Sequence, residues 1–300
     1  MEDFKKYIDS LKTSYNRAEI AEILSSDSRF NGNLPDALDY LHSIEDYEAE
    51  KQKYTFDDIG NSERVYTRHG NDFQYVADRK VWQFYTGKVW QDDSTNKIIA
   101  AGKETARSIL IEAYAEPDDK RSTDLIKHSK TSSSGMRVKA MIELSIPDLA
   151  VTVRELDNYP YLLNVNNGTI DLRTGELKPH DKNDRITSII PIDYDPAAKS
   201  DIWESFLNDT FESNQELINY MRIWFGYCAT GSQIEQKFQF WFGPLSNNGK
   251  STLSGAIKHV MGPYAGEIDP SNFMVSKNQN TIGPNEALAG LYNKLSLIHI

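Results

Sequence analysis

Cysteine is almost absent from this 300-residue sequence: Cys228 is the single one, so no disulfide can form within the chain. The histidines are scattered, and no group of Cys and His has the spacing of a structural zinc site. Chains without disulfides are typical of reducing compartments. We therefore expect a cytoplasmic protein that carries no structural metal.

Long apolar runs are missing too. No stretch is both long and apolar enough to span a bilayer, and the first residues, MEDFKK, lack the apolar core of a secretory signal. A hydrophobic fraction of 39% and a mean hydropathy of −0.57 are typical of a soluble protein. Three hundred residues suggest about two domains, which is enough chain to bury sizeable cores.

An excess of positive charge is also absent, because the formal net charge is −11. This balance argues against a protein that binds nucleic acid over its whole surface. It leaves room for a ring-shaped motor, which needs basic residues only along its channel. The acidity is concentrated at the start of the chain, since residues 1–60 hold 14 Asp or Glu and 7 Lys or Arg.

The most informative stretch that is present is residues 238–252, which read FQFWFGPLSNNGKST. A strand-like aromatic run enters a loop of Gly, Pro and Asn, and a helix is expected from 251 to 261. This layout is typical of a phosphate-binding P-loop. Backbone N–H groups surround the phosphates, the helix dipole adds to their attraction, the lysine reaches the outer phosphates, and the serine hydroxyl binds Mg²⁺. The sequence therefore predicts a nucleotide hydrolase that uses ATP and Mg²⁺.

Each position of this motif has an expected role. Lys250 is the predicted catalytic residue, and the Ser251 hydroxyl is the predicted Mg²⁺ ligand. The predicted nucleotide-binding residues are Gly243, Ser246, Asn247, Asn248, Gly249, Lys250, Ser251 and Thr252. The standard motif places four residues between its first glycine and the Gly-Lys pair, whereas five lie between Gly243 and Gly249. Either Pro244 takes the first-glycine position or the loop has one extra residue.

A plainer interpretation of the motif is an Asn/Ser turn before a helix that starts with Lys-Ser by chance. The strand-like run before the loop and the helix after it favour the nucleotide site, because they supply the context that the motif needs.

Residues 1–60 predict an acidic helical segment. Apolar residues recur at helical spacing near 4–11 and 20–24, a further helix is expected at 34–47, and residues 48–58 are linker-like. We favour a solvated helical appendage, with a protein-docking segment as the alternative.

Residues 61–95 predict a small antiparallel sheet, with strands at 73–76 and 81–85 and a turn at 86–88 that leads into residues 89–90. Its aromatic residues, Trp82, Tyr85 and Trp90, stand beside Arg79, Lys80 and Lys88. They could stack bases, although filling the core of the sheet is the favoured interpretation.

Residues 96–155 predict helices. One apolar face is formed by Ile98, Ala101, Ala106, Ile109 and Leu110, and another runs through residues 136–144. A loose basic cluster, Lys127, Lys130, Arg137 and Lys139, surrounds a Ser-rich turn and is interpreted as a solvated face.

Residues 159–195 predict a β-meander, with strands at 161–165, 169–172 and 186–192 and a hairpin turn NNG at 166–168. Nothing in the meander demands catalysis. Two amphipathic helices, at 202–211 and 215–227, precede the P-loop, and a short helix at 286–291 and a buried strand at 295–300 follow it.

Four segments, taken in order, resemble the primase-helicase family of phages, plasmids and poxviruses, whose motor is a superfamily 3 helicase. They are residues 73–90 (FQYV and the aromatic hairpin), 162–175 (LLNVNNGTIDLRTG), 226–238 (GYCATG and EQKF) and 248–265 (NGKST and GPYA). They span most of the chain from residue 61 to residue 295, and their order is far more specific than the P-loop alone.

The resemblance implies an AAA+ ATPase that assembles into a ring, a hexamer in this family, around single-stranded or forked DNA. ATP hydrolysis would drive translocation during replication of a phage, plasmid or other mobile element, in a bacterial host or phage-infected cell, with other replication proteins as further partners. Carried over by position, Lys250 would contact the β- and γ-phosphates and Ser251 would hold Mg²⁺. Asn248 and Gly249 would shape the loop.

The expected fold is therefore α/β and α+β in several domains. Residues 1–60 would be an acidic helical segment and linker, 61–200 a helicase-associated domain, and 201–300 the start of an AAA+ domain with a parallel sheet flanked by helices. The family's acidic strand end, polar sensor and trans-acting arginine would lie beyond residue 300, so we expect a truncated chain. The N-terminal region is too short for a primase domain, which predicts a helicase that does not synthesise primers.

Two other functions compete with the helicase. A non-catalytic DNA- or protein-docking remnant would fit the acidic N-terminal region, the aromatic hairpin and the incomplete ATP site. A small-molecule kinase would share the P-loop, but the long N-terminal region and the family-like segments argue against it.

Overall fold

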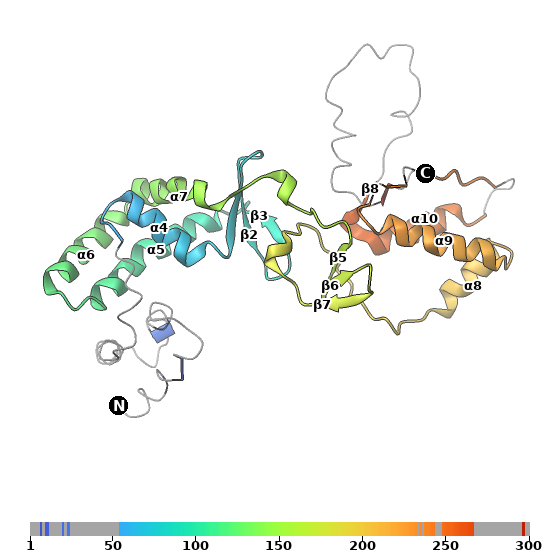
Figure 1. Cartoon of the computed structure of the whole chain (residues 1–300), viewed down its shortest axis with the longest axis horizontal. Helices are drawn as coiled ribbons and strands as arrows, with labels where there is room; N and C mark the ends of the chain where they lie inside the picture. Colours follow the sequence, from blue (N-terminus) through green and yellow to red (C-terminus); the bar gives the residue numbers. More distant parts are fainter. Residues whose placement is uncertain are drawn as a thin grey trace, which may run out of the picture. The chain divides into compact units, whose positions relative to one another are not determined.

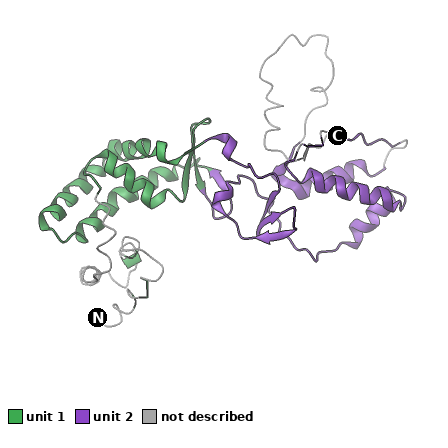
Figure 2. Cartoon of the chain, viewed as in Figure 1, with its two compact units in different colours: residues 1–84, 92–151 green, residues 85–91, 152–300 purple. Residues whose placement is uncertain are grey.

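The computed structural model describes residues 54–232, 234–235, 237–243 and 248–266, together with Tyr7, Ser10, Leu11, Ile20, Ile23, Leu24, Ser296 and Leu297. These residues form mixed α/β structure (Figure 1). The chain divides into two compact units, residues 1–84 with 92–151 and residues 85–91 with 152–300 (Figure 2). Among the described helices, none is long and apolar enough to cross a membrane.

Four helices make up most of the first unit: α4 (Asp58–His69), α5 (Lys97–Tyr114), α6 (Asp119–Ser132) and α7 (Gly135–Leu149). Side chains that accept a backbone N–H fix the start of three of them, namely Asp57 for α4, Asp118 for α6 and Ser134 for α7. The helices bury one core, whose members are Val65, Phe73, Ile98, Ala101, Ala106, Val138, Met141 and Ile142.

A four-stranded sheet has the order β3-β2-β1-β4. Strand β1 (Phe73–Val76) pairs antiparallel with β2 (Val81–Tyr85) and parallel with β4 (Ala150–Val151), and β3 (Trp90–Asp92) lies at the edge. The buried amide of Gln74 donates to Gln83 Oε1 at 2.8 Å, and Gln83 Nε2 donates to Asp92 Oδ1 at 2.9 Å. This chain of hydrogen bonds crosses three strands and fixes their register.

The second unit contains a three-stranded antiparallel sheet of β5 (Leu162–Val165), β6 (Gly168–Asp171) and β7 (Glu176–Lys178). Gly168 has φ 157° at the hairpin, and a Cβ there would lie 2.3 Å from Lys178 O, so only glycine fits. Short 3₁₀ turns occur at Val153–Glu155, Lys182–Asp184 and Gly262–Tyr264. The core beside the sheet consists of Leu163, Val165, Ile170, Ile190, Met261, Tyr264 and Ala265.

Three helices complete the second unit: α8 (Asp201–Thr210), α9 (Gln215–Cys228) and α10 (Lys250–Met261). They share a small core of Leu207, Ile218, Met221 and Leu253. After α10, β8 (Ala265–Gly266) pairs parallel with β9 (Ser296–Leu297). Within the described residues of unit two, β8 and β9 form the one parallel strand pair, so the expected AAA+ domain with a parallel sheet flanked by helices is not evident there.

Most of the predicted elements are confirmed, including the aromatic hairpin, the hairpin around the NNG turn and helices α8, α9 and α10. Trp90 is 5% exposed and Trp82 packs on the helical core, which confirms core filling for these aromatic residues. Helix α4 was missed. The strand predicted at 186–192 is wrong, because its pairing there is limited to a single bridge from Ile190 to Val165.

Some expectations differ in detail or lie outside the described residues. Met136, Leu144 and Leu110 were assigned to apolar helix faces but are 80%, 45% and 37% exposed. The helices predicted at 34–47 and 286–291 lie outside the description. Before residue 54, the six described residues are all helical and fall in or near the two segments for which helical spacing was predicted. Ile20 and Leu24 are fully buried.

Candidate nucleotide-binding site

The predicted phosphate loop meets the first turn of α10. Gly249 is the N-terminal cap of this helix and has φ 77°, a left-handed conformation that favours glycine. A Cβ on Gly249 would also lie 2.7 Å from Thr210 Oγ1, at the end of α8. Glycine is therefore required here for its backbone conformation and for the close approach of α8.

The side chain of Lys250 turns back toward the loop. Its Nζ donates to Asn248 Oδ1 at 2.5 Å. A Cβ on Gly243 would lie 1.7 Å from Asn248 Nδ2 and 3.3 Å from Lys250 Nζ, so the two ends of the loop are in contact. Gly243, Asn248, Gly249 and Lys250 thus lie close together, and their assignment to a nucleotide site stays a prediction. Ser246 and Asn247 lie outside the described residues.

The surface at the start of α10 is chemically suited to an anion. Its first turn contains no acidic residue, and no side chain caps the helix. Ser251 and Thr252 are exposed, which leaves their hydroxyls accessible. The N–H groups of a helix N-terminus, a lysine ammonium and two hydroxyls at one helix end can bind phosphate oxygens. The inner face of the helix is fixed by Leu253, which is buried in the core shared with α8 and α9.

The segment before the loop differs from the prediction. Residues 237–243 form no strand, and Phe238, Phe240 and Phe242 are 75%, 88% and 90% exposed. The alternate side chains do point inward: Trp241 contacts Phe225 edge-on at 5.9 Å, and its Nε1 donates to Gln239 Oε1 at 2.8 Å. The alternation of a strand is thus retained. A strand also needs a neighbour to accept and donate its backbone hydrogen bonds, and no described strand pairs with this segment.

In the described part of the chain, no group of three or more His, Cys, Asp or Glu side chains could hold a metal ion. The assignments of ATP, Mg²⁺ and the individual P-loop roles stay predictions.

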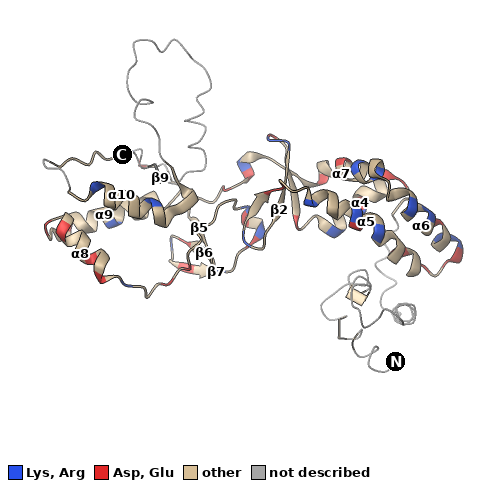
Figure 3. Ribbon diagram, turned by 180° about the vertical axis from the view of Figure 1, so that it is seen from behind, with Lys and Arg blue, Asp and Glu red and all other residues tan. Residues whose placement is uncertain are grey.

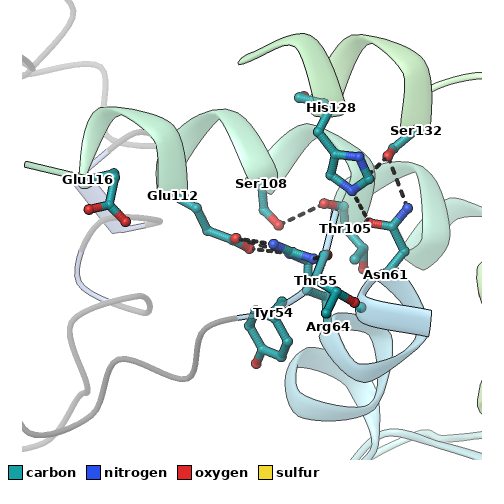
Figure 4. A network of polar contacts seen from close by, with 12 residues as sticks. Tyr54, Thr55, Asn61, Arg64, Thr105, Ser108, Glu112, Glu116, His128 and Ser132 are labelled. Atoms are coloured by element: carbon teal, nitrogen blue, oxygen red, sulfur yellow. Dashed lines mark hydrogen bonds and ion pairs between the residues drawn. The ribbon is translucent and has the colours of Figure 1, made fainter. Parts of the chain in front are cut away.

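A second polar cluster lies in the helical unit (Figure 4). The guanidinium of Arg64, 1% exposed, donates to both Glu112 oxygens over 2.7–2.9 Å and to Thr55 O at 3.2 Å. Beside it, His128 Nε2 lies 2.9 Å from Asn61 Oδ1, and burial lowers the pKa of His128. Every one of these groups is paired within the cluster. These contacts attach α4 to α5 and α6. The sequence pattern did not indicate the cluster, because helix α4 itself was not predicted.

The Asn-rich hairpin serves a structural purpose as well. Asn166 Nδ2 donates to Asp193 Oδ1 at 2.6 Å, and Asn167 donates to Tyr194 O and accepts from Tyr194 N. These bonds attach residues 193–194 to the turn.

The predicted basic cluster around the α6–α7 turn is partly neutralised. Arg137 pairs with Asp58 at 3.4 Å and Lys127 with Asp124 at 3.2 Å. Figure 3 shows Lys and Arg interspersed with Asp and Glu along these helices. The arrangement agrees with a solvated face.

One comparison with known proteins gives a match. The family model described as D5 N terminal like matches residues 62–212, about half of the chain. This stretch runs from α4 to the end of α8 and stops before the phosphate loop. No curated protein matches the chain.

Proposed function

The chain belongs to the D5 N terminal like family, the N-terminal domain of D5-like primase-helicases, and we propose that it acts as an ATP-dependent DNA helicase. The helicase would act in replication of a phage, plasmid or other mobile element. The observation that carries the proposal is the contact of Gly243, Asn248 and Lys250 at the start of α10, in a chain whose residues 62–212 match a D5 N-terminal domain.

The side chains at α10 define how nucleotide would be held. The phosphates would bind the free N–H groups of the first turn, with Lys250 on the β- and γ-phosphates and the Ser251 hydroxyl on Mg²⁺. The ion would supply charge neutralisation at the phosphates. Thr252 and the backbone around Gly249 would complete the cradle. Single-stranded or forked DNA and a ring of identical subunits, a hexamer, are the proposed partners.

The test is nucleotide binding. We expect Mg-ATP to bind the protein and Lys250→Ala to weaken that binding, because the lysine ammonium attracts the phosphate oxygens. Lys258→Ala is the matched control, since Lys258 is an exposed lysine in the last turn of the same helix. Equal binding by Lys250→Ala and the unaltered protein would contradict the proposal.

A docking remnant is the second candidate, and the extent of the family match favours it, because residues 62–212 form a D5 domain without the loop. A protein of this kind would bind DNA with a salt-dependent affinity that nucleotide does not change. Titration of single-stranded DNA at several salt concentrations, with and without Mg-ATP, separates the two candidates.

A further inference from the structure

We propose that Asn248 is a positioning residue that joins the two ends of the phosphate loop and aims the Lys250 ammonium group; this inference rests on the nucleotide site proposed above. One planar amide makes both contacts. Its Oδ1 accepts from Lys250 Nζ at 2.5 Å. Its Nδ2 packs against Gly243, so closely that a Cβ on that residue would lie 1.7 Å from Nδ2. Among the described residues, no carboxylate forms an ion pair with Lys250.

The chemistry of this contact suits a phosphate ligand. An ammonium group has three N–H donors. One is directed to Asn248, which leaves two for phosphate oxygens. Because the acceptor is a neutral amide, it fixes the lysine without cancelling its positive charge, whereas a carboxylate at this position would form an ion pair and repel phosphate. A lysine side chain held in advance loses less rotamer freedom when the ligand binds.

The same contact also explains why position 243 is a glycine. Five residues separate Gly243 from Gly249, one more than in the standard motif. Gly243 nevertheless approaches Lys250, with its Cβ position 3.3 Å from Nζ. Gly243 must then be glycine for a steric reason, although its position relative to the Gly-Lys pair departs from the pattern.

The deciding experiment is a double-mutant cycle on Mg-ATP affinity, measured by titration with a fluorescent ATP analogue up to millimolar concentration. We expect Asn248→Ala to weaken binding about tenfold, the scale of one hydrogen bond to a charged group. In a Lys250→Ala background, Asn248→Ala should have no further effect, because it acts through the lysine. With Lys258→Ala as the matched second change, the two effects should add. A merely structural loss would add in both backgrounds.

Asn248→Asp supplies the charge test. It preserves the shape of the amide but places a carboxylate against the ammonium, so we expect it to bind nucleotide more weakly than Asn248→Ala. Thermal unfolding of each variant shows whether the fold is intact.

The outcomes separate the two proposals. If the unaltered protein binds Mg-ATP and Lys250→Ala loses it, while both Asn248 variants bind like the unaltered protein or add to Lys250→Ala, the positioning role is wrong and the nucleotide site stands. If the unaltered protein does not bind Mg-ATP, the nucleotide site fails and this inference fails with it.

Discussion

Asn164 Oδ1 and His180 Nδ1 lie 2.8 Å apart in the second unit. Asn164 Nδ2 donates to Lys88 O at 3.0 Å and Ser188 O at 3.3 Å. Its Oδ1 must therefore accept, from His180 and from Thr169 Oγ1 at 3.0 Å. The fully buried amide uses all of its donors and acceptors and joins four segments of the unit.

Replacing this amide should destabilise the second unit. We expect Asn164→Ala to reduce the free energy of unfolding by about 2–4 kcal/mol, since four side-chain hydrogen bonds of a fully buried amide are lost. Native-state hydrogen exchange of the β5 and β6 amides measures this unit separately from the helical one. Asn183→Ala is the control, because Asn183 is exposed and its side chain bonds only to nearby Asp181. Equal protection in both variants would refute the role of Asn164.

Breaking the Arg64–Glu112 pair should destabilise the helical unit. Arg64 is 1% exposed and Glu112 29%, so removing the carboxylate leaves a buried guanidinium without its charge partner. We expect Glu112→Ala to cost about 3 kcal/mol, at the lower end for buried pairs because Glu112 is partly solvated. Denaturant unfolding followed by hydrogen exchange of α4 checks it, with exposed Glu143→Ala as the control. A cost no greater than that of Glu143→Ala would contradict the prediction.

The histidine in the same cluster should make the helical unit sensitive to acid. Burial is the largest cause that holds the pKa of His128 below its ordinary value of 6.5, followed by Arg64 and Arg137, while Asp57 and Asp58 oppose them. Because the folded-state pKa is lowered, the contribution of the neutral ring is present above pH 6.5 and is lost as the pH falls through the folded-state pKa. We expect the unfolding free energy to decline as the pH drops below 6.5.

The control for this pH dependence is His128→Gln, whose side chain does not titrate. The difference in unfolding free energy between the two proteins should change with pH below 6.5 and stay constant above it. Parallel pH profiles at all values would show that His128 does not carry the effect.

The sequence predicts local structure well where a pattern is completed by near neighbours. The hairpin around residues 166–168 follows from alternation and turn chemistry, and helices α8 to α10 follow from their apolar spacing. Helix α4 was missed because several of its buried residues are polar. Asn61 and Arg64 are buried only because α5 and α6 supply Glu112, His128 and Ser132 as partners. No local pattern encodes such partners.

The candidate site shows the same limit. The motif predicts the glycine, the lysine and the helix that follows, because each is a local requirement. It does not predict that the Asn248 amide contacts Gly243, nor that Thr210 lies against Gly249, since both depend on how separate segments pack. Residues 238–242 show the opposite case. Their alternation predicts a strand, but a strand forms only where another segment pairs with it, and no described strand does so here.

Gly249 offers a test in which two causes of destabilisation can be separated. An alanine at φ 77° costs about 1 kcal/mol or more for the left-handed backbone. Its Cβ would in addition lie 2.7 Å from Thr210 Oγ1 and 3.0 Å from Thr210 Cγ2, so the Thr210 side chain or the helix that carries it must shift. We expect Gly249→Ala to reduce the unfolding free energy by about 2–3 kcal/mol, the sum of backbone strain and overpacking.

Thr210→Ala should return the steric part of that loss and leave the backbone part, because it removes both Thr210 atoms but not the positive φ. The matched control is Gly255→Ala in the same helix, where nothing lies within 4 Å of the added Cβ. That change should instead stabilise α10 by up to about 1 kcal/mol, the helix preference of alanine over glycine. Thermal and denaturant unfolding of the four proteins give these differences. If Gly249→Ala were as stable as Gly255→Ala, neither the left-handed cap nor the contact with α8 would exist in solution.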